Sequence, residues 1–203
     1  MAVALARRMR KLIVVVALSV VSFATLQFSY ADDFAFSEHL SGSIQIVDEC
    51  SPNALERIDN PRPVVGSTIP NIVHQIWKTA DVQEYSTEIA ASRESWRAML
   101  EPSNYTVKLW TDDDILELIK ANYTWLLPTY NGYPHDIQRA DLARLLIVHT
   151  EGGIYSDLDV YPCSAEHLKC LQTLGLQAIF SRTAGTLGLS NHCFMAKPGS
   201  PFL

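Results

Sequence analysis

The chain has 203 residues, a formal net charge of -6 at pH 7 and a sequence pI near 5.4. This acidic balance argues against nucleic acid as a partner, because nucleic-acid-binding domains carry an excess of Lys and Arg. The length suffices for one domain with its own core, but not for two.

The amino terminus has the pattern of a secretory targeting segment. It begins with a basic cluster made of Arg7, Arg8, Arg10 and Lys11. A largely apolar run over 12–28 follows, and Asp32 and Asp33 come after it. Such a segment is either a cleaved signal peptide or a signal anchor whose basic end stays in the cytosol. We expect a hydrophobic helix over 1–30, with the rest of the chain lumenal or extracellular.

Residues 31–68 have little periodicity and contain Pro52, Pro61 and Pro63. We interpret them as a stem or linker with one short strand over 43–47. The remaining residues, 69–203, form the expected globular domain.

The globular part alternates between strand and helix patterns. Strands are expected at 71–77, at 106–110, around Ile154 and at 177–181, and helices within 84–100 and at 112–122 and 135–151. This alternation predicts an α/β sheet with parallel pairs and a ligand crevice at the carboxyl ends of its strands. Thr111 is expected to cap the second helix, which explains the acidic run that follows it without a metal site.

The helix over 135–151 is the clearest of these. Apolar or aromatic residues recur along it at Leu142, Leu145, Leu146 and His149. Gly152 and Gly153 mark its end. Asp141 and Arg144 are three residues apart, so they are neighbours on the helix surface and could pair with each other.

Two carboxylates follow the glycines in the segment Gly152-Gly-Ile-Tyr-Ser-Asp-Leu-Asp159. Side chains alternate along a strand, so Tyr155, Asp157 and Asp159 are expected to point to one face together. Like charges so close repel unless a cation lies between them, and carboxylate oxygens suit Mg²⁺ or Mn²⁺. An ion held by only one or two carboxylates completes its shell with substrate phosphates, which indicates a phosphorylated donor.

Cysteines and sequons agree with a secretory compartment. Cys50, Cys163, Cys170 and Cys193 form an even set that allows three full pairings. A disulfide between Cys163 and Cys170 would close a short loop, but the sequence leaves the pairing open. Asn104 and Asn122 begin N-x-Thr sequons, which predict N-glycosylation at the surface.

Three blocks in this order resemble the glycosyltransferases with a DXD-type sugar-binding region, most closely glycosyltransferase family 32 with its fungal alpha-mannosyltransferases. The blocks are Ile69-Pro-Asn-Ile-Val-His-Gln-Ile-Trp-Lys-Thr79, Arg139-Ala-Asp-Leu-Ala-Arg144 and Gly152-Gly-Ile-Tyr-Ser-Asp-Leu-Asp159. The resemblance runs from about Ile69 to Leu203. It implies a GT-A, Rossmann-like nucleotide-sugar-binding domain behind a type II Golgi or ER membrane anchor.

The resemblance also implies roles for single residues. Asp157 and Asp159 match the ligands of a Mn²⁺ or Mg²⁺ ion that bridges the donor diphosphate. The donor-binding positions of the family correspond to Trp77, Arg139, Asp141, Arg144 and Tyr155. From the residues alone, Trp77 reads equally well as a core residue of a buried strand, and Arg144 as a structural brace for Asp141.

The expected reaction is transfer of a hexose with retention, mannose from GDP-mannose first, although UDP-sugars suit the same blocks. The acceptor is a glycan or a sphingolipid. Chains of the family continue past the segment that matches 198–203, so we expect the donor half without a complete acceptor half. The alternative function is a catalytically silent module that binds a nucleotide sugar or partners a full-length enzyme in a Golgi transferase complex.

Overall fold

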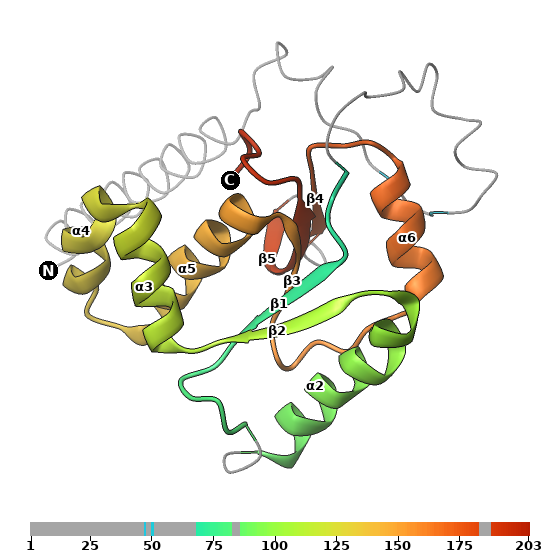
Figure 1. Ribbon diagram of the computed structural model, residues 1–203, viewed down its shortest axis with the longest axis horizontal. Coiled ribbons are helices and arrows are strands. Elements are labelled where there is room, and N and C mark those ends of the chain that lie inside the picture. Colours follow the sequence, from blue (N-terminus) through green and yellow to red (C-terminus); the bar gives the residue numbers. More distant parts are fainter. Residues whose placement is uncertain (1–46, 48–49, 51–67, 83–85, 183–187) are drawn as a thin grey trace, which may run out of the picture. The chain divides into compact units, whose positions relative to one another are not determined.

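The structure is a computed structural model that describes residues 47, 50, 68–82, 86–182 and 188–203 (Figure 1). The expected hydrophobic helix over 1–30 and almost all of the stem, with its strand over 43–47, lie outside the described residues. Among the helices that are described, none has the length and apolar composition needed to cross a membrane.

Within the described residues, five strands form one mixed sheet in the order β2-β1-β3-β5-β4. They are β1 (Ile72–Ile76), β2 (Thr106–Trp110), β3 (Gly153–Ser156), β4 (Ala178–Arg182) and β5 (Leu189–Ala196). β1 runs parallel to β2 and β3, whereas β5 runs antiparallel to β3 and β4. The prediction of parallel pairs is therefore confirmed for the first three strands. Strand β5 was not expected, and its antiparallel direction makes the sheet mixed.

Helices cover both faces of this sheet. The structure contains α2 (Thr87–Leu100), α3 (Asp112–Asn122), α4 (Leu127–Gly132), α5 (Asp136–Glu151) and α6 (Ala165–Thr173), with short 3₁₀ turns η3 (Glu101–Ser103) and η4 (Thr124–Leu126). Figure 1 shows α3, α4 and α5 on one side of the sheet and α2 and α6 on the other. Thr111 caps α3 as expected, because its hydroxyl accepts from the backbone of Asp114, whose carboxylate bonds back.

Alternate residues of the strands supply the two halves of the core. Val73, Ile154 and Met195 point to the side of α2 and α6, where they pack with Trp96 and Leu168 in one buried cluster. The residues between them in the strands, such as Tyr155 and Phe194, point to the side of α5 and pack with Val148. The face that a strand residue occupies can therefore be read from its register.

The passage from α5 into β3 is tight. Gly152 ends α5 with a φ of 67°, and Gly153 begins β3 with a φ of 104°, values that favour glycine. A Cβ atom on Gly153 would lie 2.6 Å from the carbonyl oxygen of Ile72. His74 joins the same junction: its Nδ1 accepts from the Trp110 indole at 3.0 Å, so its Nε2 donates to the carbonyl of Gly152 at 2.8 Å.

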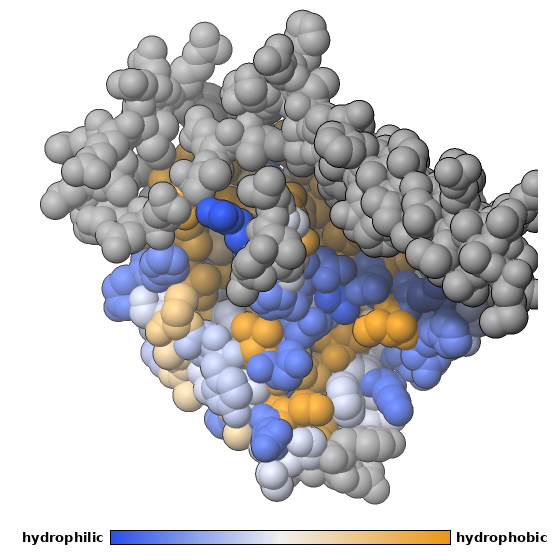
Figure 2. All heavy atoms as spheres, turned by 180° about the vertical axis from the view of Figure 1, so that it is seen from behind, coloured by the Kyte–Doolittle hydropathy of each residue, from blue (hydrophilic) through white to orange (hydrophobic). Residues whose placement is uncertain are grey.

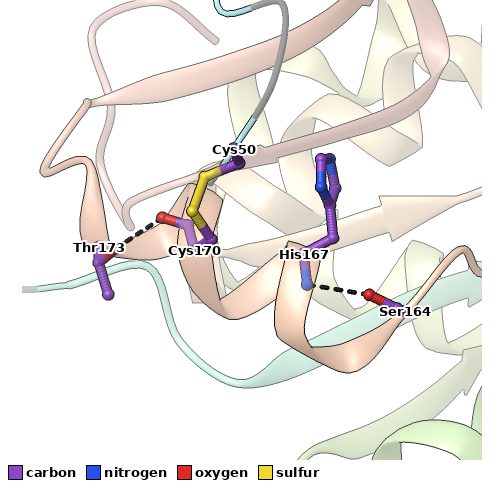
Figure 3. Close-up of a disulfide and its surroundings, with 5 residues drawn as sticks. All are labelled: Cys50, Ser164, His167, Cys170 and Thr173. Atoms are coloured by element: carbon purple, nitrogen blue, oxygen red, sulfur yellow. Dashed lines mark hydrogen bonds between the residues drawn. A yellow bond between two sulfur atoms is a disulfide. The ribbon is translucent and has the colours of Figure 1, made fainter. Parts of the chain in front are cut away.

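One disulfide connects Cys50 to Cys170 of α6 (Figure 3). Ser164 caps α6 by accepting from the backbone N–H of His167 at 3.0 Å, so the helix starts just beyond Cys163. Six helical residues at about 1.5 Å each separate Ser164 from Cys170, which exceeds the distance of about 7 Å that a disulfide can span. The short-loop pairing of Cys163 with Cys170 is therefore wrong, because a helix holds those two residues apart.

The surface carries scattered apolar side chains. The large exposed ones are Trp125, Ile137, Tyr161, Leu189 and Phe202. On the face shown in Figure 2, hydrophobic residues form several small patches between hydrophilic ones. Single exposed apolar residues of this kind are normal on a folded domain.

Candidate functional site

The carboxylate pair lies on a turn and not within a strand. β3 ends at Ser156, and the backbone N–H of Val160 donates to the carbonyl of Asp157 at 3.1 Å, which closes a turn over 157–160. The expectation that Asp157 and Asp159 share one strand face is therefore wrong. The chain leaves the sheet after Ser156, and the carbonyl of Val160 is bound by Ser92 and Trp96 of α2 and not by a neighbouring strand, so Leu158 is buried while Asp159 is exposed.

Asp157 is held by two neighbouring side chains. The hydroxyl of Tyr155 donates to one carboxylate oxygen at 2.7 Å, and Nη1 of Arg144 lies 3.3 Å from the other. Burial raises the pKa of the Tyr155 hydroxyl above its usual value, and the negative charge of Asp157 adds to this. Tyr155 therefore keeps its proton at neutral pH and stays a donor to Asp157.

Arg144 is the centre of the cluster. Its side chain is only 5% exposed and pairs with Asp141 at 3.1 Å as well as with Asp157. Its Nη1 also donates to the carbonyl of Asn191 at 3.1 Å, and the guanidinium lies 5.0 Å from the centre of the Tyr155 ring. A buried guanidinium requires such partners, because an unpaired charge away from water is very costly. The predicted pairing of Arg144 with Asp141 is confirmed.

Strand direction explains why these residues meet. β1 and β3 are parallel, so their carboxyl ends lie at one edge of the sheet, and the antiparallel β5 begins at that edge. Asn191 near the start of β5 therefore approaches the residues that follow β3. Its side-chain amide donates to Asp141 of α5 at 3.2 Å. This edge, where it meets α5, is the place at which strand order predicts ligand binding.

Helix α2 anchors the turn from the other face of the sheet. The Ser92 hydroxyl and the Trp96 indole both donate to the carbonyl of Val160, at 2.8 Å and 2.7 Å. Sequence reasoning missed both residues as parts of the site. They are more than 60 residues away from Val160 in the sequence, and no sequence motif indicates that two side chains donate to one backbone carbonyl.

Trp77 and Arg139, the other two residues predicted to bind the sugar donor, have different surroundings. Trp77 follows β1 directly, is half-buried, and its backbone N–H donates to the carbonyl of Trp110 at 3.0 Å. The parallel register of β1 with β3 puts Trp77 at the same edge as Asp157. Arg139 instead contacts Asp136 and donates to the carbonyl of Tyr133.

The predicted glycosylation sites are both accessible. Asn104 ends η3 with a left-handed backbone, and Asn122 is the last residue of α3. Both side chains are exposed, as an acceptor asparagine requires.

The donor set of the site fits a divalent cation that also binds phosphates. Within the described residues, no three His, Cys, Asp or Glu side chains gather closely enough to hold a metal ion by themselves. Asp157 and Asp159 on one turn would supply hard oxygen ligands, and Arg144 is the cation that, among the residues described, pairs with Asp141 and Asp157. The cluster is therefore negative overall. Two carboxylates with substrate phosphates are a common way to hold Mg²⁺.

Comparisons with known proteins identify relatives of this chain. Residues 86–178 match the family described as glycosyltransferase sugar-binding region containing DXD motif. The chain is 33% identical over 147 residues to inositol phosphoceramide mannosyltransferase 1 of Schizosaccharomyces pombe, an alignment that covers 71% of this chain and 44% of that protein. It is 36% identical over 158 residues to mannosyl phosphorylinositol ceramide synthase SUR1 of Saccharomyces cerevisiae, covering 77% of this chain and 39% of that protein.

Among solved structures, PaToxG glycosyltransferase aligns with a TM-score of 0.46 at 16% identity, over 66% of this chain and 57% of that chain. A likeness this low carries no argument. The chain spans less than half the length of the two yeast relatives. The resemblance stated from the three sequence blocks is nevertheless confirmed: the chain belongs to the glycosyltransferases with a DXD-type sugar-binding region, and its relatives are fungal mannosyltransferases.

Proposed function

We propose that this chain is the donor-binding part of a retaining, metal-dependent glycosyltransferase that takes mannose from GDP-mannose. The observation that carries the proposal is Arg144, a buried cation that contacts Asp141 of α5 and Asp157 of the turn at one edge of the sheet. UDP-sugars are the alternative donors. The yeast relatives are named for inositol phosphoceramide, so a glycolipid acceptor is favoured over a glycan.

The chain's own residues have separable tasks in this proposal. A Mn²⁺ or Mg²⁺ ion bound by Asp157 and Asp159 would supply positive charge to the diphosphate that leaves as the glycosidic bond breaks. Tyr155 fixes the orientation of Asp157 through its hydroxyl. Arg144 adds a second positive charge beside the donor, and Asp141 accepts hydrogen bonds from sugar or ribose hydroxyls.

Two residues complete the donor site in this proposal. The Trp77 ring stacks on the nucleotide base, a contact that suits a half-buried indole at the carboxyl end of a strand. Arg139 lies one and a half turns before Arg144 on α5 and contributes positive charge at the rim of the site. Both assignments rest on the match of these positions to the family blocks.

We also infer that the domain faces the lumen of the Golgi or ER. What supports this is the Cys50–Cys170 disulfide, which persists in oxidising compartments, and the exposure of Asn104 and Asn122. Endoglycosidase treatment of the protein from a eukaryotic host tests the placement. A shift in electrophoretic mobility that the paired Asn104→Gln and Asn122→Gln substitutions abolish is expected, and an unglycosylated product would contradict it.

The function is tested with the purified full chain, GDP-mannose and Mn²⁺. Calorimetry measures binding, and release of GDP measures hydrolysis of the donor. Binding is expected to require Mn²⁺ and to fall at least tenfold in Asp157→Asn and Asp159→Asn. Asp113→Asn is the matched control, because Asp113 is an exposed carboxylate in the first turn of α3 and should bind as the wild type does.

The outcomes separate the candidate functions. Binding with slow hydrolysis supports the transferase, whereas binding without any hydrolysis favours the silent nucleotide-sugar-binding module. The proposal is overturned if neither GDP-mannose nor a UDP-sugar binds with Mn²⁺ while the protein is folded.

A further inference from the structure

Two cysteines outside the disulfide lie on either side of the turn that carries the carboxylates. Cys163 is exposed and Cys193 is half-buried, and both are free thiols. Cys163 follows the turn by three residues. Cys193 belongs to β5 and pairs with Ser156, the residue that directly precedes the turn. The two thiols therefore bracket the segment that the proposed donor site depends on.

The register of β5 fixes the face to which Cys193 points. Tyr155 and Phe194 are partners across β3 and β5, and both pack on the side of α5. Their neighbours Ser156 and Cys193 are partners as well, so they point to the opposite face. That face is covered by α2 and α6, and Met195, two residues further along β5, is buried there.

Cys163 lies on this same face. The turn leads into Val160, whose carbonyl is bound by Ser92 and Trp96 of α2 and whose side chain packs against the cluster on that side. Three residues later the chain enters α6 through its cap residue Ser164. Cys163 thus occupies the link between two points that are both fixed on the face to which Cys193 points.

The electrostatics of the thiols agree with this proximity. Burial raises the pKa of Cys193 to about 11, and the next contribution is the charge of Cys163, followed by that of Asp157. Interaction between two charges weakens with distance, so an effect of Cys163 on the pKa of Cys193 agrees with their placement on one face of the sheet.

We propose that Cys163 and Cys193 form a second, reversible disulfide that ties the segment after the Asp157 turn to β5. In an oxidising compartment paired thiols of this kind are oxidised, and the chain already holds one disulfide there. The new bond would close a loop over 163–193 and restrain the segment after the turn on the same face of the sheet as Ser92 and Trp96. The proposal does not depend on which sugar the site binds.

The chemistry is thiol–disulfide exchange with a small disulfide such as oxidised glutathione. The thiolate of Cys163, the exposed partner, attacks one sulfur of the oxidant and releases one glutathione thiolate, leaving a mixed disulfide on Cys163. Cys193 then loses its proton, attacks the sulfur of Cys163 and releases the second glutathione thiolate. One oxidant disulfide becomes two thiols while the protein loses two thiol hydrogens and gains one S–S bond.

The test is a thiol count and a peptide map of the purified full chain. The protein is first kept with a mild reductant that leaves Cys50–Cys170 intact, and two thiols are expected to react with N-ethylmaleimide. After incubation with oxidised glutathione and removal of the excess, that number is expected to fall from two to none. Digestion without reduction should then yield a peptide pair joined through Cys163 and Cys193.

Matched variants identify the bond. Cys163→Ser should keep one alkylatable thiol after the same treatment, because it lacks the exposed thiol that attacks the oxidant. Cys193→Ser should instead stop at the mixed disulfide, with one glutathione on Cys163, which the wild type should not retain. The Cys50–Cys170 peptide pair should be unchanged in both variants. The peptide map of the wild-type protein does not require either variant, so it still identifies the bond if one of the variants fails to fold. The proposal is overturned if both thiols remain alkylatable, if Cys163 carries only glutathione, or if Cys163 joins two copies of the chain.

Discussion

The guanidinium of Arg144 contacts the carboxylate of Asp157 across thirteen residues of sequence, with Nη1 and Oδ2 3.3 Å apart. This contact joins α5 to the turn after β3. Because the Arg144 side chain is only 5% exposed, it depends on the pairing more than a surface arginine would. The consequences can be measured without knowing the acceptor.

Replacing Arg144 by Leu is expected to lower the free energy of unfolding by about 1–3 kcal/mol, the range for a lost hydrogen bond to a charged group. Asp157 and Asp141 would then face each other's charge without a cation between them. Urea unfolding followed by circular dichroism measures the change. Arg139→Leu is the control, because its partner Asp136 is 85% exposed and such surface pairs contribute at most about 1 kcal/mol. Equal losses in the two variants would contradict the assigned role of Arg144.

Replacing Ser92 by Ala is expected to cost about 1 kcal/mol, because it removes one of the two donors to the Val160 carbonyl. Binding of Mn²⁺ with GDP-mannose should weaken as the turn loosens. Ser95→Ala is the matched control on the same helix, since the Ser95 hydroxyl bonds only to the carbonyl of Ser92. If Ser95→Ala weakens binding as much as Ser92→Ala does, α2 does not position the turn through Val160.

Stability is expected to fall as the pH is lowered through the window set by His74. Burial lowers the pKa of His74 from 6.5 to about 4 in the folded chain, so the unfolded chain takes up a proton first. The folded state therefore loses stability between about pH 6.5 and about pH 4, by up to about 1.4 kcal/mol per pH unit. Unfolding curves at several pH values measure this slope.

Two histidine variants test whether His74 causes this dependence of stability on pH. His74→Gln should be less stable at neutral pH, because it loses the fixed contacts with Trp110 and Gly152, but its stability should depend less on pH. His135→Gln, at an exposed position before α5, should keep the wild-type slope. A wild-type slope that survives in His74→Gln would assign the titration to another group.

Replacing Gly153 by Ala is expected to cost about 2–4 kcal/mol, the range for strain at a special backbone position. The new Cβ would lie 2.6 Å from the backbone oxygen of Ile72, and the φ of 104° is unfavourable for alanine. Thermal unfolding measures the loss. Gly132→Ala at the end of α4 meets nothing within 4 Å and should stay within about 1 kcal/mol of the wild type. Wild-type stability in Gly153→Ala would show that the α5–β3 junction is looser than described.

Replacing Cys50 and Cys170 together by Ser is expected to lower stability by about 2–5 kcal/mol, because the disulfide closes a loop with a sequence separation of 120. Strong reductant should lower the melting temperature of the wild type to that of the double variant. The melting temperature of the double variant should not respond to the reductant when Cys163 and Cys193 are kept as free thiols. A wild-type protein insensitive to reductant would contradict the pairing of Cys50 with Cys170.

Much of the fold follows from local sequence signals. The bounds of β2 and α3 match the expectation, and α5 starts one residue later than predicted, because caps and glycines mark where these helices begin and end. α4, α6 and β5 were missed as elements. The two helices are short, with 6 and 9 residues, and β5 alternates only weakly, so tertiary packing rather than local pattern decides their place.

The sequence by itself determined the family, through three ordered blocks, and placed Asp141 and Arg144 as neighbours on one helix that could pair. Only the tertiary structure decided that Asp157 and Asp159 lie on a turn, that Arg144 also binds Asp157, and that Cys50 pairs with Cys170. The physical reason is the sequence distance over which local rules act. Spacing along a helix or strand fixes neighbours a few residues apart, whereas the order of strands in the sheet and the contacts of α2 with Val160 bring together residues that no local rule connects.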